Sequence, residues 1–214
     1  MTWLQRLLKR RSPADQQRWV VLDVEASGLD PARDRLLAIA ALGVHIDGGR
    51  ARIALADSFE VVLRQPADEA PPDKGNILLH HIGVGAQRGG VEAADAIDAF
   101  TSFVASSPLL GFHVAFDRGL IERAVASCQR TLSHSNPWLD LEALAAVLLP
   151  QVKARALDDW LAHFGIRCLQ RHHAMADALA SAELLLHLWP RLMSERATTV
   201  GAAARLATRR RWLA

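Results

Sequence analysis

The chain has 214 residues, of which 50% are apolar and 22% are charged, and its formal net charge is +2 at pH 7. This length is typical of one domain with short extensions, and the composition excludes a disordered, collagen-like or wholly coiled-coil chain. The small positive charge does not by itself indicate a nucleic-acid partner.

The first part of the chain predicts an antiparallel meander of three strands. Its apolar runs are rich in β-branched residues and are separated by turn signals, Ser27-Gly28 after the first run and Asp47-Gly48-Gly49 after the second. A loop rich in Pro and Gly follows, with one short apolar stretch inside it. The strands are expected at residues 19–29, 36–46 and 52–63, the loop at 64–90 and its apolar stretch at 77–82.

The rest of the chain alternates between helices and strands. Segments with helical spacing of apolar residues alternate with short apolar runs, and Pro150, Gly165 and Pro190 each end a predicted helix. This pattern predicts an α/β fold with a five-stranded mixed sheet covered by helices. The helices are expected at 91–104, 115–128, 141–149, 157–164 and 174–188, and the fourth and fifth strands at 108–113 and 138–141.

Basic segments flank the predicted domain of residues 18–190. Residues 1–17 predict an extension with a short amphipathic helix, and residues 191–214 predict a basic tail that ends in ATRRRWLA. Each segment could dock a protein partner or nucleic acid, or the helix could pack on its own domain. No apolar run reaches the roughly 18 residues of a membrane span. Because Cys128 and Cys168 form no disulfide framework, a cytoplasmic location is expected.

The first predicted strand carries two carboxylates on one face. Asp23 and Glu25 are two residues apart, so their side chains point to the same side of the strand. Burying two like charges together is costly unless a divalent cation or basic side chains compensate for it. Carboxylate oxygens suit Mg²⁺ or Mn²⁺. The alternative is that both side chains lie at a solvated strand end.

Two more acids and a histidine lie near predicted helix starts. Asp117 falls in the first turn of the helix after the fourth strand, where an acid often serves only as a cap. Asp177 lies beside the buried stripe of the last long helix, and His172 precedes it by five residues. Each of these residues has an ordinary structural explanation, but their order along the chain is typical of one family.

These residues resemble the motifs of the histidine subclass of the DEDD 3′→5′ exonucleases, which includes the proofreading epsilon subunit of bacterial DNA polymerase III. Residues 23–28 are similar to the motif Asp-x-Glu-Thr-Thr-Gly, residues 112–117 to His-Asn-x-x-Phe-Asp, and residues 172–178 to His-x-Ala-x-x-Asp-Ala. The resemblance covers residues 18–190. The chain contains no Tyr, which excludes the tyrosine subclass.

The chain departs from these motifs at three positions. Ala26 replaces the first Thr, His113 stands where Asn is usual, and Phe112 stands where His is usual. The metal-ligand positions are intact, so the departures concern the grip on the terminal nucleotide.

The resemblance implies a ribonuclease H-like fold and a hydrolytic site. Asp23, Glu25, Asp117 and Asp177 would hold two Mg²⁺ or Mn²⁺ ions, and His172 would act as the general base. The implied substrate contacts are Ala26, Ser27, Gly28, His80, His113 and Phe116.

The expected function is release of nucleoside 5′-monophosphates from the 3′ end of DNA, single-stranded or frayed, in proofreading or repair. One alternative is an enzyme of the same superfamily that trims RNA 3′ ends, because contacts to the RNA 2′-hydroxyl are not readable from sequence. Another alternative is a non-catalytic module on the same fold that binds nucleic acid or a polymerase.

Overall fold

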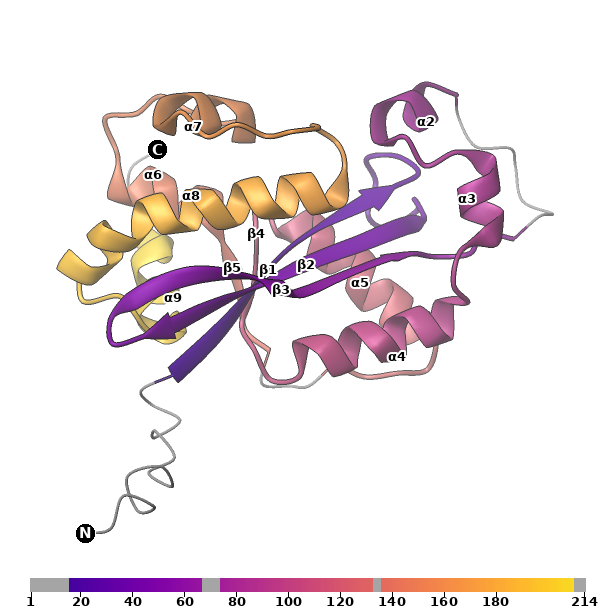
Figure 1. The fold of residues 1–214 in the computed structure, drawn as a ribbon, viewed down its shortest axis with the longest axis horizontal. Coiled ribbons are helices and arrows are strands. Elements are labelled where there is room, and N and C mark those ends of the chain that lie inside the picture. Colours follow the sequence, from indigo (N-terminus) through magenta and orange to yellow (C-terminus); the bar gives the residue numbers. More distant parts are fainter. Residues whose placement is uncertain (1–15, 67–73, 133–135, 210–214) are drawn as a thin grey trace, which may run out of the picture.

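The computed structural model describes residues 16–66, 74–132 and 136–209. A five-stranded sheet runs through them, with strands β1 (Gln16–Ala26), β2 (Leu36–Asp47), β3 (Arg50–Val62), β4 (Leu109–Gly111) and β5 (Trp138–Asp140). The strand order is β3-β2-β1-β4-β5, which places β1 in the centre (Figure 1). The pairs β1–β2 and β2–β3 are antiparallel, whereas β1–β4 and β4–β5 are parallel. The predicted five-stranded mixed sheet, with a meander as its first three strands, is confirmed.

Helices cover both faces of the sheet. They are α2 (Lys74–His80), α3 (Val84–Gly89), α4 (Ala93–Val104), α5 (Ala115–Ser127), α6 (Leu141–Leu148), α7 (Leu157–Phe164), α8 (Ala174–Ser194) and α9 (Val200–Ala207). In Figure 1, α6 and α8 lie above the sheet and α4 and α5 below it, while α2 and α3 stand at one end. No helix in the described part of the chain is long and apolar enough to cross a membrane.

The central strand β1 is buried on both faces because its side chains alternate between two hydrophobic clusters. Trp19 and Val21 pack into the cluster that includes α6 and α8. Val20 and Leu22 pack into the other cluster, with α4 and α5. Asp23 and Glu25 continue the face of Trp19 and Val21, since residues two apart in a strand share a face.

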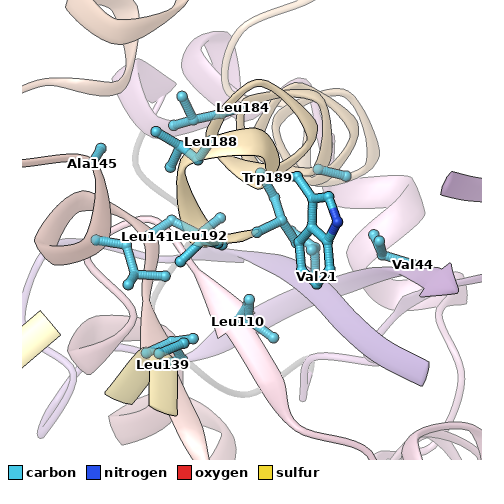
Figure 2. Packing of buried hydrophobic residues seen from close by; sticks show 14 of the residues in the cluster. Val21, Val44, Leu110, Leu139, Leu141, Ala145, Leu184, Leu188, Trp189 and Leu192 are labelled. Atoms are coloured by element: carbon cyan, nitrogen blue, oxygen red, sulfur yellow. The ribbon is translucent and has the colours of Figure 1, made fainter. Parts of the chain in front are cut away.

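Helix α8 continues through Pro190 to Ser194, whereas the sequence predicted that it would end before the proline. A proline inside a helix costs about 3 kcal/mol, so packing must compensate here. Trp189 and Leu192 are buried beside it in the cluster shown in Figure 2. The Trp189 ring meets Trp19 edge-on at a centroid distance of 5.5 Å, and its indole Nε1 donates to the carbonyl oxygen of Gly49 at 2.9 Å.

Residues 191–209 belong to the folded domain. Ala197 and Leu206 join the same hydrophobic cluster as α8, so the predicted domain boundary after residue 190 falls inside a continuous helix. At the other end, β1 already begins at Gln16. The predicted helix near the N-terminus and the basic residues 210–214 lie outside the described residues.

The predicted loop at residues 64–90 contains two short helices, α2 and α3, so the expectation of a plain loop was wrong. The two helices have seven and six residues. Leu78 and Leu79 of α2 are exposed. Because neither helix buries a periodic apolar stripe, the sequence carried no helical signal there.

Candidate active site

A pocket of about 420 Å³ gathers all of the predicted acids. Asp23 and Glu25 enter it from β1, Asp117 from the first turn of α5, and Asp177 from the first turn of α8. His172, two residues before α8, lines the same pocket. The structure therefore brings together five residues that are spread over about 150 positions of the chain.

The turn after β1 fixes one edge of the pocket. A Cβ atom on Gly28 would lie 2.5 Å from the carboxylate of Asp34, so only glycine leaves room for this carboxylate. Asp34 in turn accepts a hydrogen bond from the Ser27 hydroxyl at 3.0 Å and another from the backbone amide of Asp30 at 2.8 Å. The carboxylate closes the turn and leaves Gly28 facing the acids.

Burial and mutual repulsion raise the pKa of three of these carboxyl groups. Burial raises the pKa of Asp23 well above its usual value, and the charges of Asp117, Asp177 and Glu25 raise it further. Burial, followed by the charge of Asp177, raises the pKa of Glu25 to about 7. Burial raises the pKa of Asp117 to about 8, although hydrogen bonds from the backbone amides of Asp117 and Val24 oppose this. The pocket therefore concentrates more negative charge than its surroundings neutralise.

Asp177 differs from the other three acids because its carboxylate has several partners. Its Oδ2 accepts a hydrogen bond from the backbone amide of His172 at 3.0 Å and forms an ion pair with Nη1 of Arg171. Its Oδ1 accepts a hydrogen bond from the Cys168 thiol at 3.3 Å. Arg171 also binds Asp158 of α7, with Nε 2.6 Å from Oδ1.

The two neighbouring histidines have different surroundings. His172 is exposed, lines the pocket and has a left-handed backbone with φ of 60°. His173 is not among the pocket residues, and its Nδ1 lies 3.9 Å from the Glu60 carboxylate on β3. The position of His172 is therefore compatible with the predicted role of general base, and that of His173 is not.

Four of the six predicted substrate contacts line the pocket, namely Ala26, Gly28, His113 and Phe116. Ser27 and His80 do not line it, and their contact with substrate stays a prediction. The Ser27 hydroxyl donates to Asp34 and accepts from the backbone amide of Arg35 at 2.8 Å, so it is already engaged in the turn. His80 is buried at the end of α2, where its Nδ1 accepts from the backbone amide of Ile82 at 3.0 Å.

Sequence reasoning missed an apolar rim around the acids. Leu79 of α2 lines the pocket and is the chain neighbour of His80, so the apolar stretch at 77–82 does reach the pocket. Asn76 fastens α2 to the end of β1, because its Nδ2 donates to the Ala26 carbonyl oxygen at 2.9 Å. No sequence signal pointed to Arg171. The lining residues that the sequence analysis did not assign are Val24, Leu29, Asn76, Leu79, Phe112, Ala156, Leu157 and Arg171.

Comparison with known families agrees with this site. A family model named RNase_T and described as "Exonuclease" matches residues 20–185. The chain belongs to this exonuclease family. The family assignment confirms the resemblance that the motifs indicated.

Several relatives of this exonuclease have names that refer to DNA polymerase III. It is 29% identical over 177 residues to the PolC-type DNA polymerase III of Clostridium perfringens. The aligned region is 83% of this chain and 12% of that protein. It is 29% identical over 194 residues to a DNA polymerase III epsilon-like protein of Rhodobacter capsulatus, covering 89% of the chain and 26% of the relative. The exonuclease thus spans only a minor part of either relative.

Solved structures of E. coli exonuclease I share the fold of this exonuclease. A complex with a dT13 oligonucleotide superposes with a TM-score of 0.69 at 21% identity, over 83% of this chain and 42% of that chain. A zinc-bound complex with single-stranded DNA has a TM-score of 0.66 at 22% identity, over 84% of this chain and 43% of that chain. At such identities the likeness concerns the fold alone.

The acids in the pocket of this exonuclease have the kind of ligand atoms that divalent cations prefer. The carboxylate oxygens of four acids are hard ligands, and Oε1 of Glu25 is buried without a hydrogen-bond partner. Within residues 16–66, 74–132 and 136–209, no three His, Cys, Asp or Glu side chains stand close enough to hold an ion.

Proposed function

We propose that this exonuclease is a metal-dependent hydrolase that removes nucleotides from the 3′ end of DNA. The observation that carries the proposal is the convergence of four carboxylates and His172 in one pocket of an exonuclease-family fold. The polymerase III relatives and the oligonucleotide complexes of exonuclease I support DNA as the substrate. The relatives also favour a role in DNA replication or repair.

The four acids would hold the cations. Asp23, Glu25, Asp117 and Asp177 offer carboxylate oxygens that suit two Mg²⁺ or Mn²⁺ ions. Such ions, when bound, lower the pKa of water and stabilise the charge on the leaving oxygen. Without cations, four carboxylates repel a phosphodiester, so substrate binding should depend on their neutralisation.

His172 would accept the proton of the attacking water. An imidazole nitrogen can accept a proton from water, and the exposure of His172 lets the proton pass on to solvent. The water oxygen forms a bond to phosphorus while the bond between phosphorus and the 3′ oxygen of the preceding nucleotide breaks. The products are a nucleoside 5′-monophosphate and a strand one nucleotide shorter, whose 3′ oxygen takes a proton from solvent.

The apolar rim would hold the terminal base. Leu29 lines the pocket beside the acids and is 92% exposed. Leu79 and Phe116 complete an apolar surface against which the face of any base can pack, without selecting its sequence. This surface suits a strand end that is not held in a duplex.

Digestion of matched DNA and RNA strands tests the proposal. Strands labelled at the 5′ end are incubated with the full chain in EDTA, Mg²⁺ or Mn²⁺, and their lengths and released mononucleotides are analysed. We expect stepwise shortening of DNA, release of 5′-monophosphates and no reaction in EDTA. Turnover in EDTA would refute the metal dependence. Faster loss of RNA would support RNA trimming, and binding without digestion would support the non-catalytic module.

A further inference from the structure

A guanidinium lies among the carboxylates of the pocket and has no role in the mechanism above. Arg171 bridges two acids, the buried Asp177 of α8 and the exposed Asp158 of α7. The side chain of Asp177 is 6% exposed and that of Asp158 is 64% exposed. Arg171 therefore spans from the inside of the pocket to its outer edge.

This bridge uses the oxygens that Asp177 would offer to a metal ion. Oδ2 is paired with Arg171 and accepts the backbone amide of His172, while Oδ1 accepts the thiol of Cys168. The positive charge of Arg171 also acts on Asp23 and Glu25. In this arrangement Arg171 supplies positive charge to the same acids that would take a divalent cation.

We infer that Arg171 is an internal counter-ion that competes with divalent cations for Asp177 and is retained by Asp158 when a metal binds. The inference rests on the proposed function, because it requires that the acids bind metal. Asp158 is a suitable second partner, since its exposed carboxylate stays solvated with or without Arg171. Arg171 is thus a positioning residue that sets the metal concentration at which the site fills.

Calorimetric titration of Mn²⁺ into the metal-free full chain, without nucleic acid, tests this role. We expect Arg171→Gln to bind Mn²⁺ at least about 5-fold more tightly than the native chain, the lower end of ordinary coupling between sites. Arg171→Lys should lie between the two, because lysine keeps the charge but cannot bridge both acids in a planar fork. As a matched control, Arg130→Gln removes a distant bidentate pair with Asp98 and should leave the affinity unchanged.

A variant of Asp158 tests whether Arg171 exchanges between Asp177 and Asp158 or only adds positive charge to the pocket. In the native background, Asp158→Asn should weaken Mn²⁺ binding, because Arg171 then has only Asp177 as its partner. In the Arg171→Gln background, the same substitution should have no effect. An Asp158→Asn effect that persists without Arg171 would overturn the exchange.

The outcomes also separate this inference from the proposed function. If the native chain binds Mn²⁺ and Arg171→Gln binds it with equal or lower affinity, the competition is refuted and the metal site stands. If the native chain binds no Mn²⁺, the metal dependence and the inference are both refuted. Thermal unfolding in EDTA shows whether each variant folds. If Arg171→Gln does not fold, the Mn²⁺ affinity of Arg171→Lys decides whether Arg171 competes with the metal ion.

Discussion

Carboxylates on the two faces of the sheet are held in opposite ways. On the α4 side, the Asp57 carboxylate of β3 accepts hydrogen bonds from Nε and Nη2 of Arg18 at 2.7 and 2.8 Å. Its Oδ2 also lies 2.7 Å from Nε2 of His45. Arg18 also stacks over the ring of Phe103, 4.6 Å from its centroid. A Cβ at Gly43 would lie 2.0 Å from this carboxylate, so the sheet leaves a space for it.

Asp23 and Glu25, which point to the other face of the sheet, have no comparable partners among the described residues. Hydrogen bonds from Arg18, together with that from His45, lower the pKa of Asp57 to about 2 despite some burial. Burial and like charges instead raise the pKa of Asp23. A carboxylate that stabilises a fold is supplied with donors, whereas one reserved for a ligand is left short of them. The comparison shows that ionisation of Asp23 is unfavourable in the folded protein, whereas ionisation of Asp57 is favourable.

The largest expected effect is that of Asp23→Asn. Loss of a central metal ligand should lower kcat about 10³-fold or more, since metal ions contribute several kcal/mol to such reactions. The same substitution should raise the stability of the metal-free protein, because it removes a buried, repelled charge. Turnover and urea unfolding in EDTA measure the two effects. A loss of stability would show that Asp23 is held like Asp57, and the comparison would fail.

The next effect is that of His172→Ala, which should lower kcat by about 10²- to 10⁴-fold, the usual contribution of a general base. Mn²⁺ affinity and stability should change little, because the ring is exposed and lies outside the hydrophobic clusters. His173→Ala is the matched control and should keep nearly normal turnover. Near-normal turnover of His172→Ala at neutral pH would remove its assignment as the base.

The metal-free protein should lose stability as the pH rises from about 5 to 8. Folding raises the pKa of Glu25 from 4.5 to about 7 and that of Asp117 from 3.8 to about 8, so the folded state binds more protons in this range. Their stabilising contribution is present at low pH and is lost as the pH passes these values, on the order of 3 kcal/mol for Glu25 alone. Urea unfolding in EDTA at several pH values measures the slope. Stability that rises over this range would contradict the raised pKa values.

The smallest effect is expected for Asp57→Asn, which should lower stability by about 2 kcal/mol and leave turnover unchanged. The cost arises because Arg18 and His45 lose a charged partner in a partly buried position. Since folding lowers the pKa of Asp57, its contribution is present above about pH 4 and is lost as the pH falls towards 2. Asp98→Asn, which breaks an exposed ion pair with Arg130, is the control and should lower stability less than Asp57→Asn does. A loss of turnover in Asp57→Asn would show that the two faces are coupled.

Sequence reasoning was successful where local periodicity decides the outcome. The spacing of Asp23 and Glu25 places both on one face of β1 in any register, because a strand alternates with a period of two. Reasoning failed where partners come from distant segments. Nothing near residue 171 indicates that Arg171 meets Asp158 across the turn after α7, or that buried tryptophan packing carries α8 through Pro190.

The same limit applies to two of the predicted substrate contacts. The Ser27 hydroxyl is engaged with Asp34 and the backbone of Arg35, and His80 is buried at the end of α2, which the sequence did not indicate. The family motifs located the right segments, and only tertiary packing decided which side chain of each segment faces the pocket.

Helix α8 has a consequence for the relative positions of the acids in the pocket. With 21 residues, the helix is about 31 Å long and carries Asp177 in its first turn, while Trp189 is anchored in the core near its other end. Asp23 and Glu25 are on the central strand, and Trp189 packs with Trp19 and Val21 on the same face of that strand. The position of Asp177 relative to these two acids is therefore fixed by core packing about twelve residues away along the helix, so a substitution at Trp189 should disturb the pocket without touching it.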